Sequence, residues 1–101
     1  MQLQVQSIHF DADHKLISFI EEKLGKLGQF HDRIISGEVF LRLDRSDNNE
    51  NKIAEIRLAI PGKELFARKQ CRTFEEATDT AVEALRRQID KHKAKGSTPA
   101  V

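Results

Sequence analysis

The sequence has no tryptophan or tyrosine, and Cys71 is its only cysteine. A single cysteine excludes an internal disulfide and a cysteine-built metal site. No apolar run approaches the length of a membrane span, and the start MQLQVQSI lacks the basic and then apolar pattern of a signal peptide. Lys and Arg exceed Asp and Glu by only one, at 17 against 16, so the chain is not generally cationic. We therefore expect a cytoplasmic protein with no cofactor, in which any affinity for nucleic acid depends on where the charges lie.

The composition that remains is that of a small folded domain. Hydrophobic residues make up 39% of the 101 residues and charged residues 33%, which suits one soluble globular core. We expect a single domain over residues 1–95, followed by a short flexible tail over residues 96–101.

Alternating and helical hydrophobic patterns divide the chain into six elements. The expected strands are residues 2–8, 34–43, 53–60 and 64–69. Asp13 can cap a first helix, which Gly28 is expected to end. A polar loop over residues 44–51 and a Pro61-Gly62 turn separate the last three strands. The order β-α-β-β-β-α predicts a two-layer α+β fold, in which both helices cover one face of a four-stranded sheet.

Strand parity predicts which side chains point toward the helices. In the second strand, Ile35, Val39, Leu41 and Leu43 share one parity and are expected to face inward. Ile56, Leu58 and Ile60 do the same in the third strand. The opposite face of the sheet carries Gln2, Gln4, Glu55 and Arg57, so we expect it to be hydrated.

A second helix is expected over residues 73–95, beginning with a capping box of Thr73 and Glu76. Alanine supplies much of its apolar stripe. Arg87, Lys91 and Lys95 recur at i, i+4 and i+8 along one flank of this stripe, and Arg86 and Lys93 lie on the other flank. The acids Glu76, Asp79, Glu83 and Asp90 are expected at the back of the helix.

The basic rows admit two interpretations. Lys23 and Lys26 flank the stripe of the first helix, and the small alanines allow the helices to approach closely, so the two rows could form one cationic ridge that binds phosphates. Alternatively, the cations are solvated, offset the helix macrodipole and pair with acids such as Glu83 beside Arg87. Periodicity alone does not separate these interpretations. For Arg68, Lys69 and Arg72, protection of an edge strand by charge is the preferred explanation.

Other chemistries find little support in the sequence. The four histidines lie on separate segments without carboxylate partners in the sequence, so a metal site is not predicted. No motif for thiol chemistry surrounds Cys71, which we expect to be a small, partly buried side chain. No paired carboxylates occur in apolar surroundings, so an enzyme is not expected. Of the six phenylalanines, only Phe40 and Phe66 are candidates for an exposed face. Recognition of RNA backbone and shape is therefore favoured over base readout.

Four segments together resemble a known family. They are MQLQV at the start, KLGKLGQFHDRI at 23–34, the Pro-Gly hairpin followed by ELFA, and LRRQIDKHKAK at 85–95. Over nearly the whole chain they resemble the short-form ribosome hibernation promoting factors, within the ribosome-associated inhibitor and sigma-54 modulation protein family. The resemblance implies a fold similar to double-stranded RNA-binding domains, in agreement with the order of elements above.

The resemblance also implies a function. Such proteins act in stress or stationary phase and bind the small ribosomal subunit in the channel for messenger RNA and the A- and P-site transfer RNAs. They inhibit translation, stabilise inactive ribosomes and contact ribosomal RNA phosphates through basic residues on both helices. The residues at matching positions are Lys23, Lys26, Arg87, Lys91, Lys93 and Lys95, and Arg86 is added although a non-basic residue is common there.

Three features depart from the family pattern. Thr73-Phe74-Glu75 replaces the usual Asp-Met-Tyr, and residues 68–72 are more basic than is typical. The sequence ends at Val101, and we expect neither the dimerisation domain nor the acidic tail that some members of the family carry. We therefore expect a free monomer of the type that promotes ribosome dimers with a separate factor, although action on single ribosomes alone stays open. The alternatives are a binding module for another structured RNA and a protein-interaction domain that uses the polar sheet face.

Overall fold

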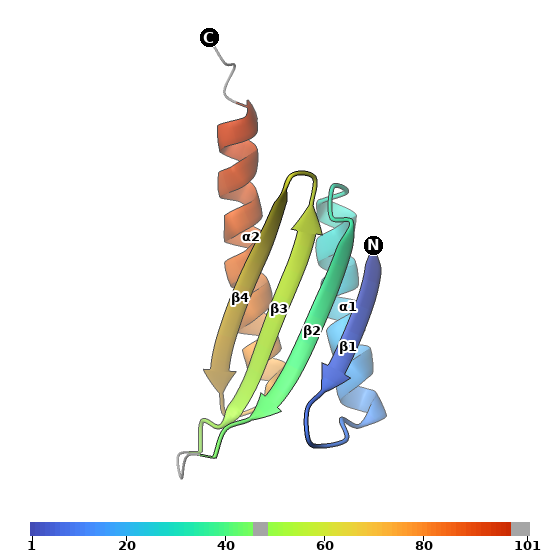
Figure 1. The fold of residues 1–101 in the computed structure, drawn as a ribbon, viewed down its shortest axis with the longest axis vertical. Coiled ribbons are helices and arrows are strands. Elements are labelled where there is room, and N and C mark those ends of the chain that lie inside the picture. The colour runs from blue at the N-terminus through green and yellow to red at the C-terminus, as the bar shows by residue number, and fades with distance from the viewer. Residues whose placement is uncertain (46–48, 98–101) are drawn as a thin grey trace.

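The computed structural model describes residues 1–45 and 49–97, and for residues 93–97 it describes the backbone alone. Its elements are β1 (Gln2–Ser7), α1 (His14–Phe30), β2 (Ser36–Leu43), β3 (Lys52–Ile60), β4 (Lys63–Cys71) and α2 (Phe74–Ser97). Figure 1 shows one sheet with both helices on the same face. The predicted order and the predicted two-layer α+β fold are confirmed.

The strands lie in the order in which they occur along the chain, β1-β2-β3-β4. β1 and β2 are parallel because α1 crosses over between them, whereas β2, β3 and β4 are antiparallel neighbours. The turn between β3 and β4 has Pro61 followed by Gly62 at φ 76°, a conformation that glycine adopts without steric cost. The sheet therefore has two edges, formed by β1 and β4.

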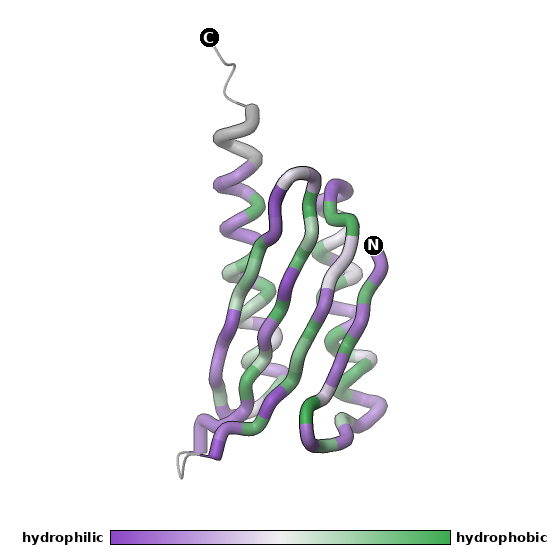
Figure 2. The backbone as a smooth tube through the Cα atoms, viewed as in Figure 1, coloured by the Kyte–Doolittle hydropathy of each residue, from purple (hydrophilic) through white to green (hydrophobic). Residues whose placement is uncertain are grey.

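Alternation along the strands sends apolar side chains toward the helices, and Figure 2 shows it as changing colour along each strand. Val39 and Leu41 are fully buried, as expected. Ile35 and Leu43, which share their parity, are instead 58% and 46% exposed. Ile35 precedes β2 and Leu43 is its last residue, so both lie at the ends of the strand. Both share the parity of the buried residues of β2, but neither is buried.

α1 begins where the sequence predicts it, because Asp13 Oδ1 accepts a hydrogen bond from the Leu16 backbone N–H at 2.8 Å. Its buried residues are Leu16, Ile20, Leu24 and Leu27. Gly28 does not end the helix, which continues to Phe30. A Cβ at position 28 would lie 3.3 Å from Met1 Cε, so this glycine leaves room for the N-terminal side chain.

α2 begins with the predicted cap, since Thr73 Oγ1 accepts a hydrogen bond from the Glu76 backbone N–H at 3.0 Å. The Phe74 ring stacks on Phe10, with 5.0 Å between ring centroids, and so ties the start of α2 to the segment before α1. The helix extends through Ser97. The remainder of the expected tail, residues 98–101, lies outside the described residues.

The core lies between the sheet and the helices. Ala77, Ala81 and Leu85 of α2 are fully buried, and they join the core residues of α1 and the inner face of the sheet in one cluster. Small side chains at Ala77 and Ala81 allow the α2 backbone to lie close to its neighbours.

Replacement of Leu85 by Ala should lower the free energy of unfolding by about 2–5 kcal/mol, because it leaves a cavity in this cluster. Leu43→Ala makes the same chemical change at a site that is 46% exposed, so its loss should be near the ~0.5 kcal/mol of surface substitutions. Urea unfolding of both variants measures the difference. Equal losses would contradict the packing of α2 described above.

Thr78 is fully buried in α2, and its Oγ1 has no hydrogen-bond partner among the described residues. Thr78→Val removes this hydroxyl and keeps the shape of the side chain, so we expect a gain of about 1 kcal/mol in unfolding free energy. Thr80 is the matched control, because its Oγ1 donates to the Glu76 carbonyl at 2.8 Å at an exposed site. Thermal unfolding should show stabilisation for Thr78→Val and none for Thr80→Val.

Candidate nucleic-acid interface

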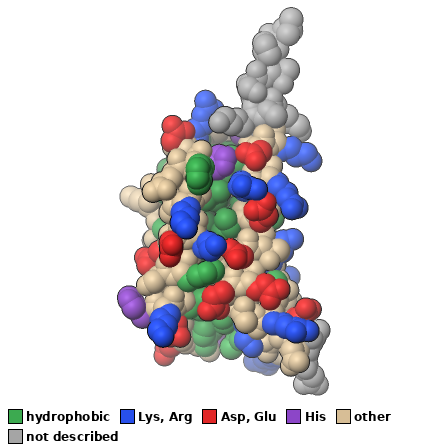
Figure 3. Space-filling view, turned by 180° about the vertical axis from the view of Figure 1, so that it is seen from behind, with side chains coloured by type: hydrophobic (Ala, Val, Ile, Leu, Met, Phe, Trp, Pro, Cys, Tyr) green, Lys and Arg blue, Asp and Glu red, His purple; other side chains and the backbone are tan. Residues whose placement is uncertain are grey.

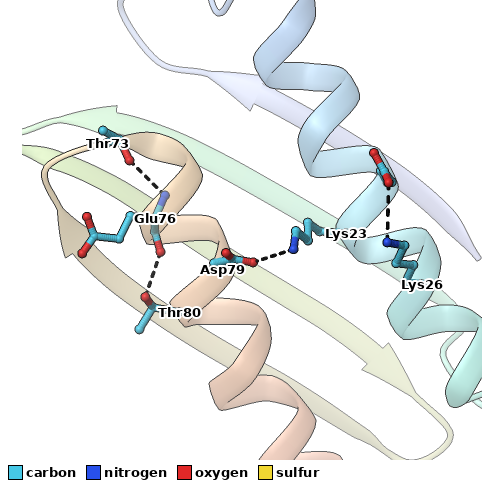
Figure 4. Close-up of polar contacts among 7 residues, drawn as sticks. Lys23, Lys26, Thr73, Glu76, Asp79 and Thr80 are labelled. Carbon is cyan, nitrogen blue, oxygen red and sulfur yellow. Dashed lines mark hydrogen bonds and ion pairs between the residues drawn. The ribbon is translucent and has the colours of Figure 1, made fainter.

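The first group of candidate residues lies on the flank of α1 that faces α2. Lys23 Nζ lies 3.1 Å from Asp79 Oδ1 of α2 (Figure 4). It also lies 5.4 Å from the centre of the Phe19 ring. Lys26 Nζ lies 3.5 Å from Glu22 Oε1, one turn earlier on the same helix. Both cations are therefore already paired with carboxylates.

The flank of α2 that faces α1 is mixed in charge. Asp79, Arg86 and Asp90 recur along it at i, i+7 and i+11. Asp90 Oδ1 lies 4.0 Å from His31 Nε2, a carboxylate neighbour that the sequence did not reveal. The expectation that Asp79 and Asp90 lie at the back of the helix was therefore wrong. Figure 3 shows acidic and basic side chains interleaved over the helical face.

Arg87 and Lys91 lie on the opposite flank of α2, toward β4. The position of this flank is fixed by Gln88, which lies next to Arg87 in sequence and whose Nε2 donates to the Phe66 carbonyl of β4 at 2.9 Å. Both cations are exposed, and neither forms an ion pair with any residue that the structure describes. Glu83, a possible partner of Arg87, instead binds Arg86 at 2.8 Å.

The predicted single ridge is thus divided into two parts. Lys23, Lys26 and Arg86 surround the line where the helices meet, and each has a carboxylate partner. Arg87 and Lys91 are on the far flank of α2 without one. The remaining candidates, Lys93 and Lys95, belong to the last turns of α2, but their side chains lie outside the described residues. The prediction that all seven residues bind RNA stays a prediction.

An aromatic side chain that the sequence did not single out lies beside Lys26. Phe30, one turn further along α1, is 79% exposed, whereas Phe66 is 47% exposed and Phe40 is partly buried. Its position after the last buried leucine of α1 was the available signal, since the stripe of the helix ends at Leu27. Exposed aromatic rings can stack on unpaired bases, so Phe30 widens the chemistry that this face offers.

Other kinds of site are less well developed. Within residues 1–45 and 49–92, no three His, Cys, Asp or Glu side chains gather as a metal ion requires. Cys71 is partly buried, as expected. A hollow of about 290 Å³ lies near the ends of β1 and β2 and is lined by Ile8, His9, Arg42, Leu43, Asp44 and Arg45, none of which is a candidate residue. Neither helix, over its described residues, is long and apolar enough to cross a membrane.

Comparison with known proteins identifies relatives along almost the whole chain. The Pseudomonas putida ribosome hibernation promoting factor is 27% identical over 95 residues, which cover 94% of this chain and 89% of the relative. The protein of the same name from Klebsiella oxytoca is 30% identical over 95 residues, with 94% and 96% covered.

Solved structures show the same fold. A ribosomal subunit interface protein from Coxiella burnetii superposes with a TM-score of 0.82 at 22% identity, covering 93% of this chain and 99% of that one. The N-terminal domain of Thermus thermophilus Protein Y gives 0.77 at 22% identity, covering 91% and 99%. The family model described as sigma 54 modulation protein / S30EA ribosomal protein matches residues 3–97. This chain therefore belongs to the sigma 54 modulation protein / S30EA ribosomal protein family.

Proposed function

We propose that this protein is a ribosome hibernation factor that binds the small ribosomal subunit where messenger RNA and the A- and P-site transfer RNAs would lie. Bound there, it inhibits translation by occupying the channel rather than by catalysis. Relatives named ribosome hibernation promoting factor, which match 94% of the chain, support the hibernation role. The observation that carries the RNA contact is the exposed and unpaired state of Arg87 and Lys91 among the described residues.

Uncompensated cations are the groups that gain most from an RNA backbone. Each phosphate that a Lys or Arg neutralises releases condensed counterions, and these contributions add along the strand. Arg87 and Lys91 give up no described ion pair when they bind. Lys93 and Lys95 follow on the same helix in the sequence, and we include them in the proposed contact surface.

The paired cations contribute differently. The ion pairs of Lys26 with Glu22 and of Arg86 with Glu83 join exposed side chains, and such pairs are worth only ~0–1 kcal/mol. Exchanging a carboxylate for a phosphate therefore costs little. We assign Lys23, Lys26 and Arg86 as further RNA contacts that form when phosphates displace their carboxylate partners.

The wider setting is part of the same proposal. We infer a cytoplasmic protein that is monomeric when free, works in stress or stationary phase and contacts ribosomal RNA directly. A separate protein would complete any ribosome dimer. Residues 1–95 form the ribosome-binding domain of this proposal.

Replacement of Arg87 and Lys91 together by Ala should weaken binding to purified small subunits. Loss of two phosphate contacts should reduce the slope of log K against log salt by about 1–2. Co-sedimentation over a range of salt concentrations measures this slope. The matched control is Lys15→Ala with Arg45→Ala, which removes the same charge from two exposed sites elsewhere. Unchanged binding of the variant without Arg87 and Lys91 would contradict the proposed RNA contact. Equal affinity of the unchanged protein for small subunits and for unrelated structured RNA would favour a general RNA-binding module.

Asp79→Asn should have the opposite effect. It removes the carboxylate that holds Lys23 at 3.1 Å and leaves that cation free for phosphate. We expect binding to small subunits to tighten a few-fold, corresponding to about 1 kcal/mol or less for an exposed pair. Lys23→Gln in the Asp79→Asn background should abolish the gain. If Asp79→Asn leaves affinity unchanged while Arg87 and Lys91 prove essential, RNA does not reach the line between the helices.

A further inference from the structure

Three more unpaired cations lie where α2 meets the edge strand β4. They are Lys63 and Lys69 of β4 and Arg72, which follows it. None of the three forms an ion pair with a residue in the described part of the chain. The charges of Lys69 and Arg72 were attributed above to protection of an edge strand, and the structure now shows what lies beside them.

The direction of the β4 side chains places two of these cations beside α2. Lys63 and Lys69 share their parity with Leu65 and Ala67, which are buried under the helix layer. Because β4 is the edge strand, their long side chains emerge along the outer flank of α2. Lys69 is accordingly only partly buried.

That outer flank is the one that carries Arg87 and Lys91. The hydrogen bond from Gln88 Nε2 to the Phe66 carbonyl places these two cations alongside the middle of β4, between the levels of Lys63 and Lys69. We name the five residues the basic seam: Lys63, Lys69, Arg72, Arg87 and Lys91. Figure 3 shows Lys and Arg side chains in succession along this edge of the molecule, at the right of the view. Lys63 and Lys69 are six residues apart, which corresponds to roughly 20 Å along a strand.

Charge on the opposite face of the sheet is arranged differently. Arg42 and Arg68 both bind Glu55, with Nε–Oε distances of 2.6 and 3.4 Å, and Arg57 lies 3.7 Å from Glu64. The arginines there are thus compensated, whereas the basic seam is not. Two acids adjoin the seam in sequence, but each faces another residue: Glu64 follows Lys63 and pairs with Arg57, and Asp90 precedes Lys91 and lies 4.0 Å from His31. Glu75 and Glu76 occupy the first turn of α2, where negative charge is favoured by the helix dipole.

We propose that the basic seam is one continuous phosphate-binding surface, so that an RNA backbone runs along β4 as well as along α2. This inference rests on the proposed function and names a part of the RNA contact that the seven candidate residues do not include. Recognition is of the backbone, because Lys and Arg side chains on an edge strand meet phosphates without reading bases. Lys63, Lys69 and Arg72 thereby have a role in binding phosphates.

The test compares two variants of the full chain that lose the same charge. The seam variant is Lys63→Gln, Lys69→Gln and Arg72→Gln, and the control is Lys15→Gln, Arg45→Gln and Arg57→Gln, three exposed cations elsewhere. Binding to purified small subunits is measured by co-sedimentation over a range of salt concentrations. We expect the seam variant to bind more weakly and to lose about 2–3 from the slope of log K against log salt, while the control keeps the slope of the unchanged protein.

A charge-preserving variant is the control for effects on folding. Lys63→Arg, Lys69→Arg and Arg72→Lys should retain both binding and slope. If the seam variant binds with an unchanged slope while Arg87→Ala with Lys91→Ala still weakens binding, the RNA contact does not extend onto β4. This inference is then wrong, and the proposed function stands. If the seam variant only aggregates, and its monomeric fraction binds normally, the charges protect an edge strand and the inference is wrong. If the unchanged protein does not bind small subunits, the proposed function and this inference fail together.

Discussion

The rotation of α2 about its own axis is the constraint on which the surface of this protein depends. Burial of Ala77, Ala81 and Leu85 fixes that rotation, because turning the helix by one residue would carry this stripe away from the sheet. A buried leucine alone contributes about 1.5–3 kcal/mol, more than an exposed ion pair can oppose. Packing thus decides which charges meet α1 and which lie at the β4 edge. The ion pair of Lys23 with Asp79 follows from this packing.

Local signals predicted the elements well. Asp13 and Thr73 were identified as helix caps because each has a side-chain oxygen just before an apolar helical repeat. Such an oxygen can accept a hydrogen bond from a free backbone N–H group of the first turn. Alternation predicted the strands because one face of the sheet is covered and the other is hydrated. Gly28 was misjudged for the converse reason. Its role depends on Met1, far away in sequence, and only the tertiary structure brings the two together.

The candidate site was harder to predict, because a helical projection orders residues around one axis and does not say which neighbour each flank meets. The sequence placed Arg87 and Lys91 on one flank of α2, but the order of the strands decides whether α1 or an open edge lies there. A right-handed β1-α1-β2 crossover sets α1 beside α2 on one side only, which leaves β4 on the other. Without the strand order, the two basic rows appeared to form one ridge. With it, Lys23 and Lys26 lie on the α1 side of α2, and Arg87 and Lys91 lie on its β4 side.

This arrangement reconciles a net charge of +1 with recognition of RNA. A protein with uniformly distributed cations attracts any polyanion, and most of that attraction is non-specific. Here the cations of the outer sheet face and of the line between the helices are held by carboxylates. Arg87 and Lys91 remain without a described partner along one edge of the molecule. An RNA surface must present phosphates in a matching line to gain from them, so the pairing of cations on the outer sheet face and between the helices favours shape-selective binding over general attraction.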